Sequence, residues 1–188
     1  MKTIGAVFLV LVLSGCVSLK IKSDIPSLDM YDLNTQFENT QCAKVDEVGL
    51  LGISSVEIYD TKSILEKSLD GKIQYLEGKV WVDFPKNMLK VLFVLEAQKE
   101  CIGVSFPPFG AYVPKKTLRL SILSFGIIKA DEPKAELVIS YEFDSAKKGL
   151  IKGVLMNKES FKENAIKALQ DVSKKTIKDL LSVIVDKK

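Results

Sequence analysis

Apolar and polar side chains alternate along three consecutive stretches in the second half of the chain. Residues 117–125, 135–143 and 150–156 place apolar side chains at every second position, which is typical of strands with one buried face. The alternation slips at Leu123, which indicates a β-bulge. We expect these stretches to form an antiparallel meander with one solvated or weakly covered face.

Two other stretches carry apolar residues at helical spacing. The first follows Asp83, a favourable N-cap, and has Pro85 in its first turn, where the missing N–H costs nothing. The second covers about 158–185, with a capping box at 160–163 and Asn157 as the alternative cap. We expect this last helix to pack on the core rather than lie on a membrane, because acidic residues interrupt its lysines.

Shorter β-rich stretches precede these elements. Strands are expected at 30–35, at 45–59 with a kink near Gly52, and around 73–82. A helix is one interpretation of the short segment 61–68. The sequence therefore predicts an α+β fold, an α/β sandwich. Its mixed or antiparallel sheet ends in the meander and is packed by two main helices.

The first sixteen residues follow a different pattern. Lys2 gives a positive start, residues 4–13 form an apolar run, and Leu13-Ser14-Gly15-Cys16 closes it. This is the layout of a secretory signal, and its apolar run is too short to cross a bilayer. The ending resembles the bacterial lipoprotein box. That resemblance implies that Cys16 is acylated and becomes the first residue of the mature chain.

These features divide the chain into a signal peptide at 1–15, a lipidated N-terminus and tether at 16–28, and a single domain at 29–188. The tether spans at most roughly 40 Å when extended. In well-studied envelope lipoproteins an Asp after the lipidated cysteine favours the inner membrane, so by resemblance Val17 indicates the outer membrane. We expect a lipid-anchored protein on the periplasmic face of that membrane.

The composition disfavours several classes of function. Without Lys2 the chain has 26 basic and 24 acidic side chains, and this small, dispersed charge gives no case for nucleic-acid binding. The sequence contains no histidine, which removes His-based triads, His general bases and the usual zinc ligand sets. We expect no catalytic residues, no metal site and no cofactor apart from the lipid on Cys16.

Two cysteines remain in the mature domain, Cys42 and Cys101. An exported chain can form disulfides, and these two permit one bridge that would close about 60 residues. The alternative is a pair of independent thiols.

The order of motifs resembles the ABC-type transport auxiliary lipoproteins, the PqiC-like family. Tyr31-Asp32-Leu33 is similar to that family's Y-x-L first strand, and 52–56 to its glycine-containing apolar strand. Trp81 and Pro85 resemble its W-x-x-P motif before a helix, although here they are four positions apart instead of three. The similarity covers most of 30–181.

The resemblance implies work beside an ABC permease and ATPase and a periplasmic protein of the mammalian-cell-entry type, moving phospholipid or similar lipids across the envelope. A lipid does not cross water alone, because its chains would expose many methylenes. The lipoprotein would dock other envelope proteins at the membrane and needs no catalytic group. Whether it forms a homo-oligomer stays open.

A loop at 107–114 contains three prolines and interrupts regular pairing. Phe106, Phe109 and Tyr112 are candidate contacts for a partner or lipid, because such a loop can hold aromatic side chains outward; their alternative is packing over the sheet edge. Trp81 is expected in the core. The alternative function is a free-standing lipoprotein that binds a small apolar ligand between sheet and helices.

Overall fold

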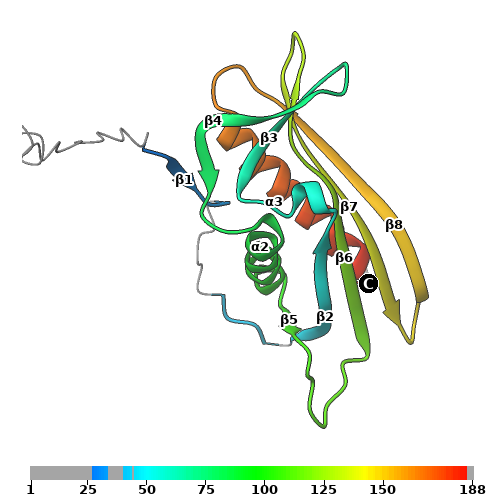
Figure 1. The fold of residues 1–188 in the computed structure, drawn as a ribbon. Helices are drawn as coiled ribbons and strands as arrows, with labels where there is room; N and C mark the ends of the chain where they lie inside the picture. The colour runs from blue at the N-terminus through cyan, green and yellow to red at the C-terminus, as the bar shows by residue number, and fades with distance from the viewer. Residues whose placement is uncertain (1–26, 34–39, 44, 186–188) are drawn as a thin grey trace, which may run out of the picture.

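The computed structural model describes residues 27–33, 40–43 and 45–185. The signal peptide, Cys16 and most of the tether lie outside the described residues. Eight strands form one mixed sheet with two long helices packed on one face (Figure 1), which confirms the α+β prediction. In chain order the elements are β1 (Asp29–Tyr31), β2 (Asp46–Ser55), the 3-10 helix η1 (Glu57–Tyr59), β3 (Ser63–Ser68), β4 (Ile73–Trp81), α2 (Pro85–Lys99), β5 (Ile102–Ser105), β6 (Lys116–Lys129), β7 (Lys134–Ser145), β8 (Gly149–Ser160) and α3 (Ala165–Ile184).

The long strand β6 organises the sheet. One of its edges pairs with β7 in an antiparallel ladder, and β7 continues to β8, as the alternation predicts. The other edge is divided: residues 117–122 pair with β2 and residues 127–129 with β3, both in parallel. β5 pairs with the other edge of β2. β4 pairs with the other edge of β3, and β1 pairs with β4. The predicted bulge is present in the β6–β7 ladder, between Ile122 and Ser124.

Three local predictions are wrong. The segment 61–68 contains the strand β3 instead of a helix, because its backbone groups pair with both β4 and β6. Residues 57–59 form η1 and do not extend β2. The last helix begins at Ala165, since the β7–β8 ladder holds the chain extended as far as Ser160.

The helix caps also differ from the prediction. Asn164 caps α3, accepting the Lys167 N–H at 2.9 Å, so neither 160–163 nor Asn157 serves as its cap. The N-cap residue of α2 is Phe84, and Pro85 is in the first turn as expected. Asp83 accepts the Phe84 N–H at 2.7 Å from just outside the helix.

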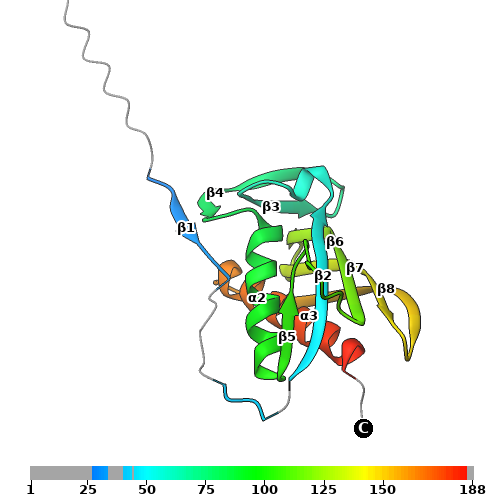
Figure 2. The same ribbon diagram turned by 90° about the horizontal axis from the view of Figure 1, so that it is seen from below.

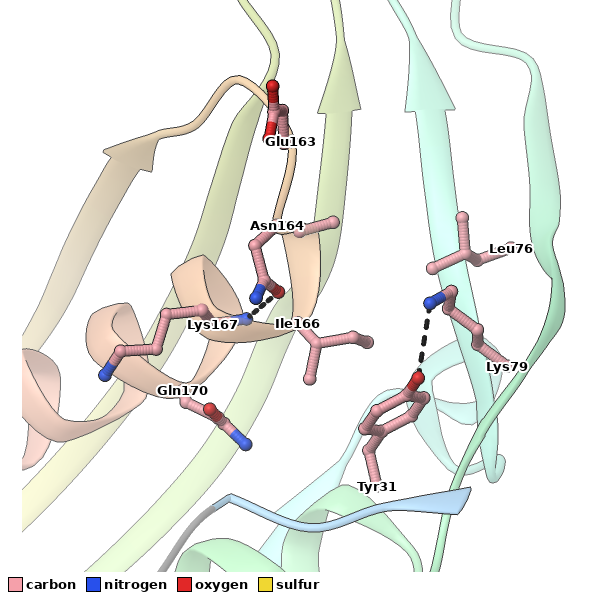
Figure 3. Close-up of a pocket in the computed structure, with 9 residues that line it drawn as sticks. Tyr31, Leu76, Lys79, Glu163, Asn164, Ile166, Lys167 and Gln170 are labelled. Carbon is pink, nitrogen blue, oxygen red and sulfur yellow. Dashed lines mark hydrogen bonds between the residues drawn. The ribbon is translucent and has the colours of Figure 1, made fainter. Parts of the chain in front are cut away.

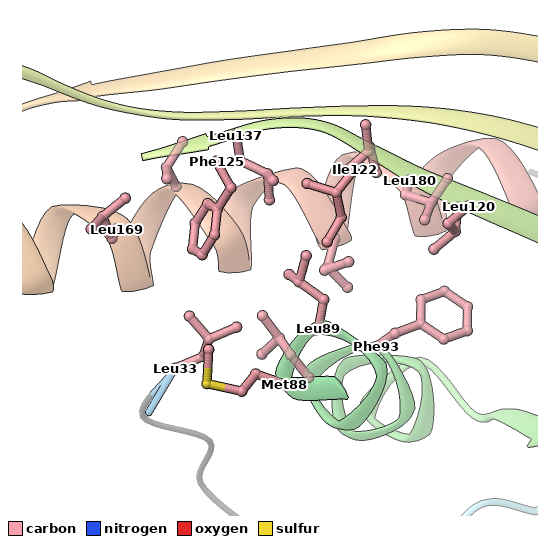
Figure 4. Packing of buried hydrophobic residues seen from close by; sticks show 14 of the residues in the cluster. Leu33, Met88, Leu89, Phe93, Leu120, Ile122, Phe125, Leu137, Leu169 and Leu180 are labelled. Atoms are coloured by element: carbon pink, nitrogen blue, oxygen red, sulfur yellow. The ribbon is translucent and has the colours of Figure 1, made fainter. Parts of the chain in front are cut away.

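The core fills the layer between the helices and the sheet (Figure 4). Leu89 and Phe93 of α2 and Leu169 and Leu180 of α3 are among its buried side chains. Trp81 is also buried, and its ring stacks on Phe125 with centroids 5.5 Å apart. Trp81 is therefore a core residue, as predicted.

Two glycines mark close approaches within the sheet. A Cβ atom on Gly126 would lie 2.5 Å from the backbone carbonyl oxygen of Leu65, where β3 joins β6. A Cβ atom on Gly153 would lie equally close to the hydroxyl of Tyr141, its cross-strand partner. At Gly126 the added Cβ atom would meet backbone atoms, which cannot easily move. At Gly153 it would meet the end of the Tyr141 side chain, which can rotate away.

We predict that Gly126→Ala lowers the free energy of unfolding by about 2 kcal/mol, because β3 must move away from β6. Gly153→Ala, the matched control, should cost about 1 kcal/mol or less, since the Tyr141 ring can shift. Urea denaturation of both variants measures the difference. Equal losses would contradict the assignment of Gly126 to a backbone contact.

Candidate functional site

A disulfide closes one end of the domain. Cys42 and Cys101 are bonded, with Cα atoms 5.6 Å apart. Cys101 lies between α2 and β5 and has a φ of 57°, a left-handed conformation that favours glycine. The bond ties residues 40–43 to the helix–strand junction and borders a groove of about 330 Å³ lined by Val45, Val94, Ile102 and neighbouring residues.

Phe106 packs rather than projecting outward. Its half-buried ring contacts the core cluster, and the Lys90 Nζ lies 4.0 Å from the ring centroid. The ammonium group of this α2 residue covers the ring in a cation–π contact. Phe106 therefore connects the start of the loop to α2.

Phe109 also packs on the domain. A Cβ atom on Gly49 of β2 would lie 3.0 Å from the Phe109 Cζ and 2.9 Å from a Pro114 ring carbon. Residue 49 is therefore a glycine for a steric reason, because the loop lies directly on the strand. Pro114 is buried in the same contact.

Tyr112 is the exposed member of the three aromatic candidates, with 57% of its surface accessible, next to Val113 at 68%. The Glu47 carboxylate of β2 raises the pKa of Tyr112 above its usual value, because it acts as an acceptor for the neutral phenol and repels the phenolate. Glu47 of β2 thus favours the neutral phenol. Of the predicted contacts, Tyr112 alone is presented to solvent, whereas Phe106 and Phe109 take the packing alternative.

A second hollow, of about 620 Å³, lies between β1, β4 and the start of α3 (Figure 3). Tyr31 stands at one side, where its hydroxyl accepts a hydrogen bond from Lys79 at 3.2 Å. The lining includes Glu163, Lys167 and Gln170 as well as Leu76 and Ile166. Sites for apolar ligands are lined mostly by apolar side chains, so this mixed lining does not suit the alternative function.

The described residues contain neither a metal-binding cluster nor a membrane-spanning helix. Across 27–33, 40–43 and 45–185, no group of three or more Cys, Asp or Glu side chains could hold a metal ion. Within the same ranges, no helix is both long and apolar enough to span a membrane.

Solved structures with a similar fold come from several sources. An uncharacterised protein superposes with a TM-score of 0.67 at 13% identity, over 85% of this chain and 99% of its own. A Xanthomonas campestris protein of family DUF330 gives 0.65 at 12% identity, over 83% and 94%. A hypothetical protein from Chlamydia trachomatis gives 0.53 at 5% identity, over 75% and 96%. At these identities the fold is what is shared. No protein-family model and no curated protein matches the sequence.

Sequence reasoning missed the partners of the loop. Glu47 and Gly49 lie on β2, Lys90 on α2, and neither element adjoins the loop in sequence. Gly49 was the available signal, since a glycine inside a strand often marks the close approach of another backbone or ring.

We predict that the double variant Cys42→Ala/Cys101→Gly is more stable than Cys42→Ala/Cys101→Ala by about 1 kcal/mol. Both variants lack the disulfide, which contributes about 4 kcal/mol in the loop-entropy model. Glycine alone relieves the left-handed backbone at position 101. Thermal and urea unfolding of the wild type and the two variants measure the loss of the disulfide and the difference between glycine and alanine at position 101. Greater stability of the alanine variant would show that position 101 leaves this conformation once the bridge is removed.

Proposed function

We propose that this protein is a lipid-anchored envelope protein that serves an ABC, mammalian-cell-entry-type lipid transport system as a non-enzymatic auxiliary. It docks other envelope proteins from the periplasmic face of the outer membrane. The observation that carries the proposal is the occurrence, in one chain, of a lipoprotein box at Cys16 and a fold shared with a DUF330 protein. The motif order that resembles PqiC-like lipoproteins supports the same assignment.

The packing of the domain also supports a docking role. The layer between sheet and helices is occupied by core side chains, so the body is suited to holding a surface in place. The loop at 107–114 rests on this body through Phe109, and it presents Tyr112 and Val113 outward. Exposed aromatic side chains on a fixed support are favourable contacts for a partner protein.

The lipid anchor would keep the protein at the membrane. Two or more acyl chains are sufficient for stable attachment, at about 0.8 kcal/mol for each buried methylene. The tether limits the distance between the domain and the bilayer to roughly 40 Å. A docking protein held in this way fixes one end of a lipid path.

We predict that mass spectrometry of the native protein finds an acylated Cys16 at the amino end. Cys16→Ser should abolish acylation and move the protein from the membrane to the soluble fraction, with the domain still folded. Release of the wild-type protein by osmotic shock, with an unmodified amino end, would overturn the anchor.

We predict that a photo-cross-linking amino acid at Tyr112 captures a mammalian-cell-entry-type protein or the ABC permease in intact cells. Tyr75 is the matched control, because it is an exposed tyrosine on β4 with 67% of its surface accessible. Capture of these components from position 112 and not from position 75 supports docking through the loop. Failure of the wild-type protein to co-purify with any such component would refute the proposed function.

A further inference from the structure

β8 leaves one side of the sheet open. It is an outer strand, and β7 is its sole strand partner among the described residues (Figure 1). The turned view in Figure 2 also shows β8 beyond β7, with α3 on one face of the sheet. Natural proteins usually cover or shorten such edges, yet β8 extends over twelve residues.

The hydrogen-bond pattern identifies the unpaired backbone groups. Phe161 donates its N–H to the Pro133 carbonyl at 3.1 Å, and the same register pairs Ser160 with Lys134 and continues without a shift. In an antiparallel ladder alternate residues bond the neighbouring strand. The odd-numbered residues of β8 therefore bond β7, and the even-numbered residues direct both backbone groups to the open side.

The side chains of these even-numbered residues share one face of the sheet. Leu150, Val154 and Met156 are 61%, 58% and 59% exposed. Exposed apolar side chains next to unpaired backbone groups are the features that strand addition uses for affinity and specificity. An extended polypeptide is thus the occupant that this edge suits.

The charges specify that polypeptide further. Lys152 and Lys158 alternate with the apolar residues, and each pairs with an acidic residue of β7. Lys152 contacts Glu142 at 2.5 Å, and Lys158 contacts Glu136 at 2.9 Å. These lysines remain 60% and 41% exposed, so each ammonium group can also donate a hydrogen bond to a second carboxylate, from a strand on the open side.

β7 already shows the complementary pattern. Across from β8 it presents Glu136, Val138, Ser140 and Glu142, with the two acidic residues six positions apart. A second strand with acidic side chains at the same spacing, and apolar side chains between them, would repeat these pairs on the other side. The pattern is symmetric, so it suits either strand direction.

We propose that the open edge of β8 binds an extended segment of a partner protein by strand addition, and that this segment carries two acidic side chains six positions apart with apolar residues at the alternate positions between them. The proposal rests on the proposed docking function and names a surface for it. It concerns a protein strand and not a lipid or a second copy of this chain.

Val154→Pro tests the proposal with little effect on the fold. Proline removes an N–H that faces the open side, and the bonds from β8 to β7 remain. Val154→Thr is the matched control, because it keeps the N–H and the branched side chain. Thermal unfolding of both variants should stay close to that of the wild type.

The probe is a blocked synthetic strand peptide with the sequence pattern Glu-Thr-Val-Thr-Val-Thr-Glu, and its counterpart has lysine in place of glutamate. Binding to the full-length lipidated protein in detergent is measured by fluorescence anisotropy. We expect the glutamate peptide to bind the wild type and Val154→Thr, and to bind Val154→Pro about tenfold more weakly. The lysine peptide should bind about tenfold more weakly than the glutamate peptide.

Several results would overturn the proposal. One is that the glutamate peptide fails to bind, or that it binds Val154→Pro as tightly as the wild type. Another is that the lysine peptide binds as tightly as the glutamate peptide. A third is that sedimentation shows self-association of the wild type but not of Val154→Pro. If transport components co-purify with Val154→Pro as well as with the wild type, β8 is not their docking surface. The proposed function would not be affected by that result. If the peptides bind as expected but no transport component co-purifies with the wild-type protein, β8 is still a strand-binding edge and the proposed function is refuted.

Discussion

The divided edge of β6 is the constraint on which the rest of the fold depends. β2 pairs with its first half and β3 with its second half, so one continuous strand joins two smaller sets of strands. The crossing point is tight, because Gly126 lies against the Leu65 carbonyl and Phe125 stacks on Trp81. α2 connects β4 in one set to β5 in the other and packs against α3. The two sets are therefore joined both through the sheet and across its face.

The sequence was sufficient for the elements whose side chains alternate or repeat regularly. The strands β6 and β7 and the helix α2 have strong patterns, because each buries one continuous face. β3 has a mixed sequence, and its strand conformation comes from pairing with β4 and β6, which a local pattern does not reveal. The start of α3 was missed for the same reason, since the ladder with β7 keeps residues 158–160 extended.

The candidate site, too, could be predicted from the sequence only in part. The proline-rich loop and the aromatic residues on it were identifiable from sequence, but their roles depend on contacts with distant elements. Phe106 packs beneath Lys90 and Phe109 packs on Gly49, while Tyr112 is exposed to solvent. Loop composition alone could not distinguish a packed ring from a presented one. The distinction lies in β2 and α2, which supply the opposing surfaces.

The shortest strand has a mechanical consequence. β1 contributes three residues to the sheet, and the chain immediately before it leads toward the amino end. Behind β1, Leu33 is buried in the core and the Asp32 carbonyl accepts the Gln170 side-chain amide at 3.0 Å. A force applied at the amino end would therefore act first on the short β1–β4 ladder and only afterwards on the contacts of residues 32 and 33.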